Sequence, residues 1–176
     1  DSESALAKID YGYWYYETNP DPPDMQWGPK FDYGRYDSTL QVFPARKYVI
    51  DSIRFWVEKF HIDGLRFDAT RAIANFDVLR ELTAAGFERA GGRKPFITIA
   101  EHVAEDPAIT GFPDGPMVAA WRFSLGAKFR AVLTGRPNDG QSPDDFDGFL
   151  AALDPAKSGY VSGGRCVNYI VSHDGF

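Results

Sequence analysis

Charged side chains stand at the ends of three apolar segments of this 176-residue chain, and they are its best candidates for chemistry. Arg66 and Asp68 end the first segment, Glu101 ends the second, and His173-Asp174 follows the third. Alternation along a strand puts Arg66 and Asp68 on one face, where the arginine favours the ionised carboxylate that a nucleophile needs. Partial burial at a strand end would let Glu101 hold the proton that a general acid supplies.

His173 and Asp174 extend this chemistry. An imidazole can donate to a substrate hydroxyl, and a further carboxylate can stabilise a developing positive charge. Each group alone also fits a structural role: an ion pair, a glutamate emerging into solvent, or an Asp-Gly turn. Together, three carboxylates with an arginine and a histidine are typical of sugar cleavage, in which two acids flank the glycosidic bond.

Metal hydrolysis is the rival chemistry for the same strand ends. Zinc or a pair of metals could be ligated there by a set of five side chains: His102, His173, Asp68, Glu101 and Asp174. The sequence has no His-x-His and no His-Glu-x-x-His, and Arg66 would repel a cation, so this alternative is weaker. A serine triad is weaker still because Gly-x-Ser-x-Gly does not occur. We therefore expect no metal and no cofactor, with calcium open for a longer parent protein.

The elements that must position these groups alternate between helix and strand. Apolar stripes and end signals predict four helices, at 44–60, from Asn75 to about Gly91-Gly92, at about 117–133, and after a cap at Ser142-Pro143-Asp144-Asp145. Strands are predicted at 62–68, 96–101 and 166–171. Residues 10–42 are expected to form a loop, because aromatic residues are followed there by several prolines and glycines.

Helices and strands that alternate, with long crossovers, indicate a parallel sheet, in either a (β/α)₈ barrel or a doubly wound fold. Polar groups at the carboxyl ends of several strands favour the barrel, and no Gly-rich phosphate loop follows a strand. A full barrel needs about 250 residues, so the sequence predicts an α/β fold that is only part of one barrel. Residues 1–42 would be its loop region and 43–176 its βα units.

Composition limits the possible partners. The chain carries 19 basic and 25 acidic residues, a net charge of −6, which argues against a nucleic-acid partner held through phosphates. No apolar run approaches the roughly 20 residues that would cross a bilayer, so no membrane partner is expected. The single cysteine, Cys166, excludes an internal disulfide framework.

Three segments resemble the second, third and fourth conserved regions of the α-amylase superfamily, glycoside hydrolase family 13: Gly64-Leu65-Arg66-Phe67-Asp68-Ala69, Ile99-Ala100-Glu101 and Val167-Asn168-Tyr169-Ile170-Val171-Ser172-His173-Asp174. The resemblance implies about the fourth to seventh strands of the family's catalytic barrel. It also implies a retaining glycosidase with an α-glucan partner, such as starch, glycogen or a maltooligosaccharide. Asp68 matches the nucleophile, Glu101 the acid/base and Asp174 the transition-state stabiliser, while Arg66 and His173 match substrate-binding residues.

Other segments resemble different members of that family. Trp27-Gly28-Pro29 and Phe31-Asp32-Tyr33-Gly34-Arg35 are similar to branching enzymes and trehalohydrolases, and the His173–Phe176 end is similar to debranching enzymes. The family's first conserved region is absent, and Arg71-Ala72 replaces an amylase-like Lys-His. Hydrolysis and transfer therefore both stay open, as does a non-catalytic glucan-binding module. An incomplete barrel also predicts that residues 1–176 alone are inactive.

Overall fold

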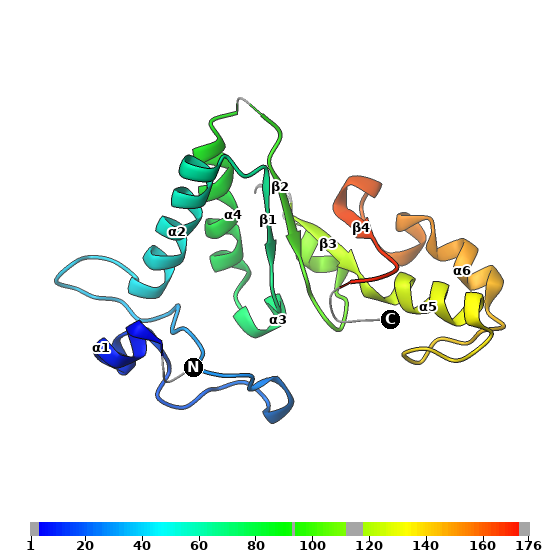
Figure 1. Ribbon diagram of the computed structural model, residues 1–176, viewed down its shortest axis with the longest axis horizontal. Coiled ribbons are helices and arrows are strands. Elements are labelled where there is room, and N and C mark those ends of the chain that lie inside the picture. Colours follow the sequence, from blue (N-terminus) through cyan, green and yellow to red (C-terminus); the bar gives the residue numbers. More distant parts are fainter. Residues whose placement is uncertain (1–3, 93, 112–117, 173–176) are drawn as a thin grey trace. The chain divides into compact units, whose positions relative to one another are not determined.

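The computed structural model describes residues 4–92, 94–111 and 118–172 (Figure 1). The chain divides into two compact units, the first made of residues 1–62 and 72–93 and the second of 63–71 and 94–176. The element order is α1 (Ala5–Trp14), η1 (Pro23–Met25), α2 (Pro44–Phe60), β1 (Gly64–Phe67), α3 (Thr70–Ile73), α4 (Phe76–Ala90), β2 (Ile97–Ala100), η2 (Pro107–Thr110), β3 (Ala119–Arg122), α5 (Phe123–Thr134), α6 (Phe146–Ala152), η3 (Pro155–Ser158), η4 (Gly163–Arg165) and β4 (Cys166–Asn168).

Two long helices, α2 and α4, pack against each other in the first unit. Pro44 occupies the first turn of α2, where its missing N–H costs nothing. Ile53 and Val57 lie one turn apart on α2 and are buried, as are Val78 and Leu82 of α4. The predicted helix at 44–60 is confirmed to the residue.

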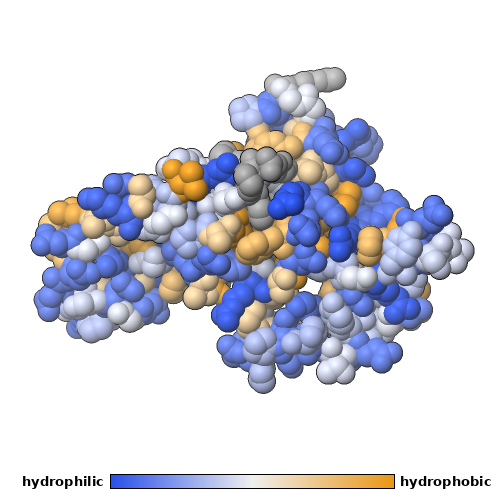
Figure 2. Space-filling model, turned by 180° about the vertical axis from the view of Figure 1, so that it is seen from behind, coloured by the Kyte–Doolittle hydropathy of each residue, from blue (hydrophilic) through white to orange (hydrophobic). Residues whose placement is uncertain are grey.

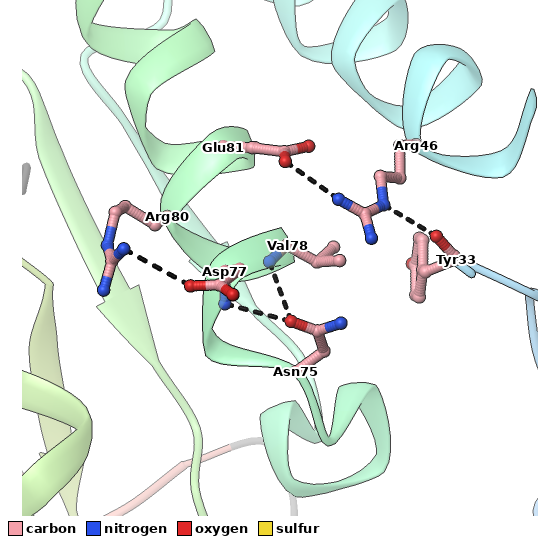
Figure 3. A network of polar contacts seen from close by, with 7 residues as sticks. All are labelled: Tyr33, Arg46, Asn75, Asp77, Val78, Arg80 and Glu81. Carbon is pink, nitrogen blue, oxygen red and sulfur yellow. Dashed lines mark hydrogen bonds and ion pairs between the residues drawn. The ribbon is translucent and has the colours of Figure 1, made fainter. Parts of the chain in front are cut away.

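The predicted end signals of α4 are also confirmed. Figure 3 shows the Asn75 Oδ1 atom accepting hydrogen bonds from the backbone N–H groups of Asp77 and Val78, at 3.0 and 3.2 Å. Gly91 ends the helix with φ of +68°, a left-handed conformation that glycine adopts without a steric cost. Arg46 of α2 forms an ion pair with Glu81 of α4 at 2.8 Å, which ties the two helices together.

The loop predicted at 10–42 is wrong at its start, because α1 continues to Trp14. Ser4 caps this helix by accepting from the N–H of Ala7, and the backbone departs from helical geometry at Asp10. Aromatic packing supports such a short helix, since the ring centroids of Tyr11 and Tyr15 lie 5.3 Å apart. From residue 15 to 42 the described chain has only η1 and isolated bridges, as expected for a loop.

The second unit contains a four-stranded parallel sheet in the order β1-β2-β3-β4. Consecutive strands of the chain are neighbours in the sheet, joined by long connections as parallel pairing requires. The described part of the connection from β2 to β3 holds only the short 3-10 helix η2. Register aligns Phe67 with Ala100, Ala100 with Ala120, and Ala120 with Cys166. Gly64 begins β1 because a Cβ atom there would collide with the carbonyl oxygen of Ile97 on β2.

Two sequence-based expectations in this unit are wrong. The helix predicted at about 117–133 contains strand β3, and α5 begins only at Phe123. The spacing of Val118, Trp121 and Leu125 is typical of a helix. The residues from Val118 to Ala120 are buried instead beside β2, where strand pairing satisfies their backbone groups. Helix α6 is capped by Asp145, whose side chain accepts from the N–H of Gly148, and not by Ser142. The three predicted strands are confirmed with shorter bounds.

Apolar residues also reach the surface. Figure 2 shows several separate apolar patches among polar side chains on the face that it presents. Among the described helices, none combines the length and apolar character needed to cross a membrane.

Candidate active site

The catalytic candidates of β1 and β2 lie in one row at the carboxyl ends of neighbouring strands. Phe67 pairs with Ala100, so the next residues, Asp68 and Glu101, stand at the following position of the same register. Residues opposite each other on neighbouring strands project to the same face of a sheet. Asp68 and Glu101 are therefore presented side by side, as the sequence predicted.

Arg66 contacts both carboxylates. Its Nη1 atom donates to Oδ1 of Asp68, and its Nη2 atom lies 2.5 Å from Oε1 of Glu101. The second contact is an ion pair without hydrogen-bond alignment, and among the described residues the Nε atom of Arg66 also has no hydrogen-bond partner. One arginine thus balances two carboxylates that would otherwise repel each other.

The two carboxylates differ in their access to solvent. The side chain of Asp68 is 74% exposed, whereas that of Glu101 is 20% exposed. Glu101 also accepts a hydrogen bond at 3.0 Å from the backbone N–H of Ala69, the residue after Asp68. The arrangement offers an accessible anion beside a more enclosed carboxyl group, which suits a nucleophile and an acid/base respectively.

His102 follows Glu101 and lies close to the same strand end. Its Nδ1 atom is 3.1 Å from the hydroxyl oxygen of Thr70, whose Oγ1 also donates to the backbone carbonyl of Glu101. Burial lowers the pKa of His102 below its usual value, with Arg71 acting in the same direction and Asp106 opposing it. A neutral imidazole at this position supports the loop after β2 and matches a structural role.

His173 and Asp174, the remaining predicted site residues, lie outside the described residues. The contacts of both remain a prediction from the sequence. Within the ranges that the structure describes, no group of three or more His, Cys, Asp or Glu side chains could hold a metal ion.

Trp121 lies beside the candidate site, a position that the sequence did not predict for it. It extends the row of Asp68 and Glu101 onto β3, and the guanidinium carbon of Arg66 lies 4.8 Å from the centre of its ring. Tyr169 packs against the same ring at 4.7 Å. The sequence predicted a helix at residue 121, and a helix does not align Trp121 with Asp68 and Glu101. A short strand at 119–122 would have predicted that alignment.

The opposite face of β3 carries a second arginine with different partners. Arg122 is 1% exposed and donates to the backbone carbonyl of Ala152 and to the hydroxyl of Ser158, both at 2.7 Å. Its guanidinium carbon lies 5.4 Å from the ring centre of Tyr160. Burial and the nearby Glu105 carboxylate raise the pKa of the Tyr160 hydroxyl above its usual value.

Glu105 connects this buried group to α5. Its carboxylate accepts hydrogen bonds from the backbone N–H of Ser124 at 2.5 Å and from the hydroxyl of Tyr160 at 3.2 Å. A carboxylate at the first turn of a helix stabilises the unpaired N–H groups there. Arg122 and Glu105 therefore hold the segments after β2, β3 and α6 together.

Curated relatives of the chain come from glycogen-related proteins. It is 40% identical over 82 residues to the 1,4-alpha-glucan branching enzyme GlgB of Nocardia farcinica, covering 44% of this chain and 10% of the relative. A GlgB of Streptomyces avermitilis is 36% identical over 102 residues, covering 54% and 11%. The chain resembles glucan branching enzymes.

A second kind of relative covers more of the chain. The glycogen operon protein GlgX homolog of Mycobacterium bovis is 28% identical over 150 residues, which is 81% of this chain and 19% of the relative. The chain therefore spans between a tenth and a fifth of the length of these relatives. No family model matches the chain.

Proposed function

We propose that this chain is part of the catalytic domain of a retaining enzyme that cleaves or transfers α-1,4 or α-1,6 glucosidic bonds. The observation that carries the proposal is the contact of Arg66 with both Asp68 and Glu101 at neighbouring strand ends. The names of the relatives contain the words 1,4-alpha-glucan and glycogen, and these support an α-glucan as substrate. The four parallel strands support a partial (β/α)₈ barrel as the scaffold.

Each carboxylate has a defined part in the proposed reaction. A carboxylate oxygen of Asp68 attacks the anomeric carbon as the glycosidic C–O bond breaks, and Glu101 gives its proton to the leaving oxygen. Water or a second glucan hydroxyl then displaces Asp68 from the sugar, and Glu101 accepts the proton of the attacking hydroxyl. Arg66 holds both side chains in position, while Asp174 and His173 bind the hydroxyls of the reacting sugar.

Transfer to a glucan hydroxyl and hydrolysis by water are the two candidate outcomes. The GlgB relatives, which are named branching enzymes and have the higher identity, favour transfer. Hydrolysis stays open because the GlgX homolog, whose alignment is longer, is named only as a glycogen operon protein. The test incubates the full-length protein with amylose and with glycogen, and counts reducing ends and branch points. Transfer adds branch points at a constant number of reducing ends, whereas hydrolysis increases the reducing ends. An unchanged substrate would leave the non-catalytic module as the better explanation.

A further inference from the structure

Two adjoining cavities in the first unit are lined by residues to which the reaction proposed above gives no role. One has a volume of about 340 Å³, and its lining includes the rings of Tyr16, Phe31 and Tyr33. The other has a volume of about 300 Å³ and its lining includes Trp27. Asp21 and Lys30 line both. We call the two cavities together the loop pocket, since most of the lining comes from the segment 16–34.

The segment around the loop pocket is held in shape by its own hydrogen bonds. The side-chain amide of Asn19 donates to the carbonyl of Gly28 at 2.9 Å, and that of Gln26 donates to the carbonyl of Asp21 at 2.6 Å. Arg46 of helix α2 adds a contact from outside the segment. Figure 3 shows its Nε atom donating to the carbonyl oxygen of Tyr33, at a distance of 2.6 Å. A preformed pocket loses little conformational entropy when a ligand binds.

Lys30 and Asp21 give the loop pocket a nearly neutral polar centre. Their side chains are 13% and 9% exposed, and the Nζ and Oδ1 atoms lie 2.5 Å apart. Within the described residues this is the single hydrogen bond of the Lys30 ammonium, which has three donors. A ligand that offers both donors and acceptors can use the remaining positions, whereas a phosphate would meet the carboxylate of Asp21.

Aromatic rings and one amide complete the chemistry of the loop pocket. Trp27 is 71% exposed and is among the residues that line the second cavity, while Tyr33 and Phe31 line the first. Asn75 lines the first cavity as well, and Figure 3 shows its amide nitrogen directed away from the first turn of α4, where its oxygen is engaged. Apolar rings beside a few convergent polar groups are typical of small-molecule sites.

We propose that the loop pocket binds a stretch of α-glucan chain, as a site additional to the catalytic carboxylates. A sugar unit combines apolar ring faces with a rim of hydroxyls that both donate and accept, which matches the rings and the Lys30–Asp21 pair. Two adjoining cavities accommodate consecutive units of one chain. The identity of the glucan rests on the proposed function, and the site itself rests on the cavities.

Hydrogen–deuterium exchange of the full-length Asp68→Asn variant with maltoheptaose tests this site locally. We expect slower exchange in peptides that cover 16–34 and 72–78, and separately in those that cover 64–70 and 97–103. Trp27→Ala should abolish the first effect and weaken binding to the loop pocket about tenfold, which corresponds to about 1.4 kcal/mol. Asn75→Asp keeps the helix cap but removes the amide donor, and should weaken the same effect.

Trp56→Ala is the matched control, because Trp56 is 49% exposed on α2 and lines neither cavity. It should leave both effects unchanged. Protection at 64–70 and 97–103 without protection at 16–34 overturns the loop pocket and leaves the proposed function standing. Protection nowhere with maltoheptaose contradicts both proposals. Protection of 16–34 by inorganic phosphate in place of maltoheptaose overturns the glucan as its ligand.

Discussion

Arg66 and Arg122 both lie near the carboxyl ends of parallel strands of one sheet, yet they lie on opposite faces and hold different partners. Arg66 joins two carboxylates, of which Asp68 is 74% exposed. Arg122 is 1% exposed and donates to neutral oxygens of Ala152, Ser158 and Asn168. An arginine near the carboxyl end of a strand therefore meets accessible charges in one case and neutral oxygens around a buried guanidinium in the other.

The different partners of the two arginines indicate that one face of the sheet suits chemistry and the other stabilises the fold. A carboxylate that an arginine orients but does not bury can still reach a substrate, so the face of Arg66 suits chemistry. Neutral acceptors around a buried arginine anchor the segments that carry them, and removing the arginine breaks all of these hydrogen bonds together. Substitutions on the first face should therefore change turnover, and those on the second face should change stability.

Asp68→Asn should have the largest effect on turnover. The amide keeps the shape of the side chain but cannot act as the nucleophile, so kcat on glycogen should fall about 10³-fold or more, equivalent to about 4 kcal/mol, while glucan binding survives. Steady-state kinetics and a binding measurement on the full-length protein check this. Asp63→Asn is the control at the other end of β1, where an exposed carboxylate pairs with Lys94. Activity of Asp68→Asn within about tenfold of wild type would remove Asp68 from the site.

Glu101→Gln should act selectively on substrates with poor leaving groups. Loss of a general acid costs about 10²–10⁴-fold where the leaving oxygen needs a proton, and much less where it does not. The measurement compares maltooligosaccharides with an activated fluoride donor. Glu88→Gln on α4, at a side chain that is 69% exposed, should leave both rates unchanged. An equal loss on the two substrates would show that Glu101 is not the acid.

Arg122→Met should destabilise the fold with little direct effect on the chemistry of the other face. It removes a buried donor from three acceptors, including the carbonyl of Ala152, and should lower the free energy of unfolding by about 3 kcal/mol. Urea unfolding gives the size of the effect, and faster hydrogen exchange in β3 and α5 gives its location. Arg136→Met, at an exposed position, should stay within about 0.5 kcal/mol of wild type. A stable Arg122→Met with impaired turnover would reverse the assignment of the two faces.

Helices with clear end signals could be predicted from the sequence. Pro44 and the Asn75/Gly91 pair mark α2 and α4 through local backbone chemistry, which tertiary contacts did not override. Strand β3 could not be predicted, since four residues between a loop and a helix show too little periodicity, and only pairing with β2 and β4 makes them a strand.

The residues of the candidate active site could likewise be predicted only where local strand patterns determine their position. Arg66, Asp68 and Glu101 were predicted together because strand alternation and parallel pairing fix their common face. Trp121 was missed because its place beside Arg66 depends on the strand that the sequence hid. Arg122 gave no sequence signal at all, since a buried arginine is recognisable only from the oxygens that surround it.

Asn75→Ala should have the smallest effect, and it calibrates the stability scale for the two arginines. The variant loses an N-cap whose Oδ1 accepts from the backbone N–H groups of Asp77, an exposed residue, and Val78, a buried one. Such a loss costs about 1 kcal/mol. Asn75→Asp retains the acceptor and adds negative charge at the helix start, so it should match or slightly exceed the wild-type stability.

Urea unfolding of both Asn75 variants beside Arg122→Met makes the comparison quantitative. The loss of unfolding free energy should be about three times larger for Arg122→Met than for Asn75→Ala, because Arg122 donates three hydrogen bonds from a buried guanidinium whereas Asn75 accepts two at a partly exposed helix end. If Arg122→Met cost no more than Asn75→Ala, the acceptors of Arg122 would be finding other donors. The contrast between the two arginine sites would then rest on the exposed carboxylates alone.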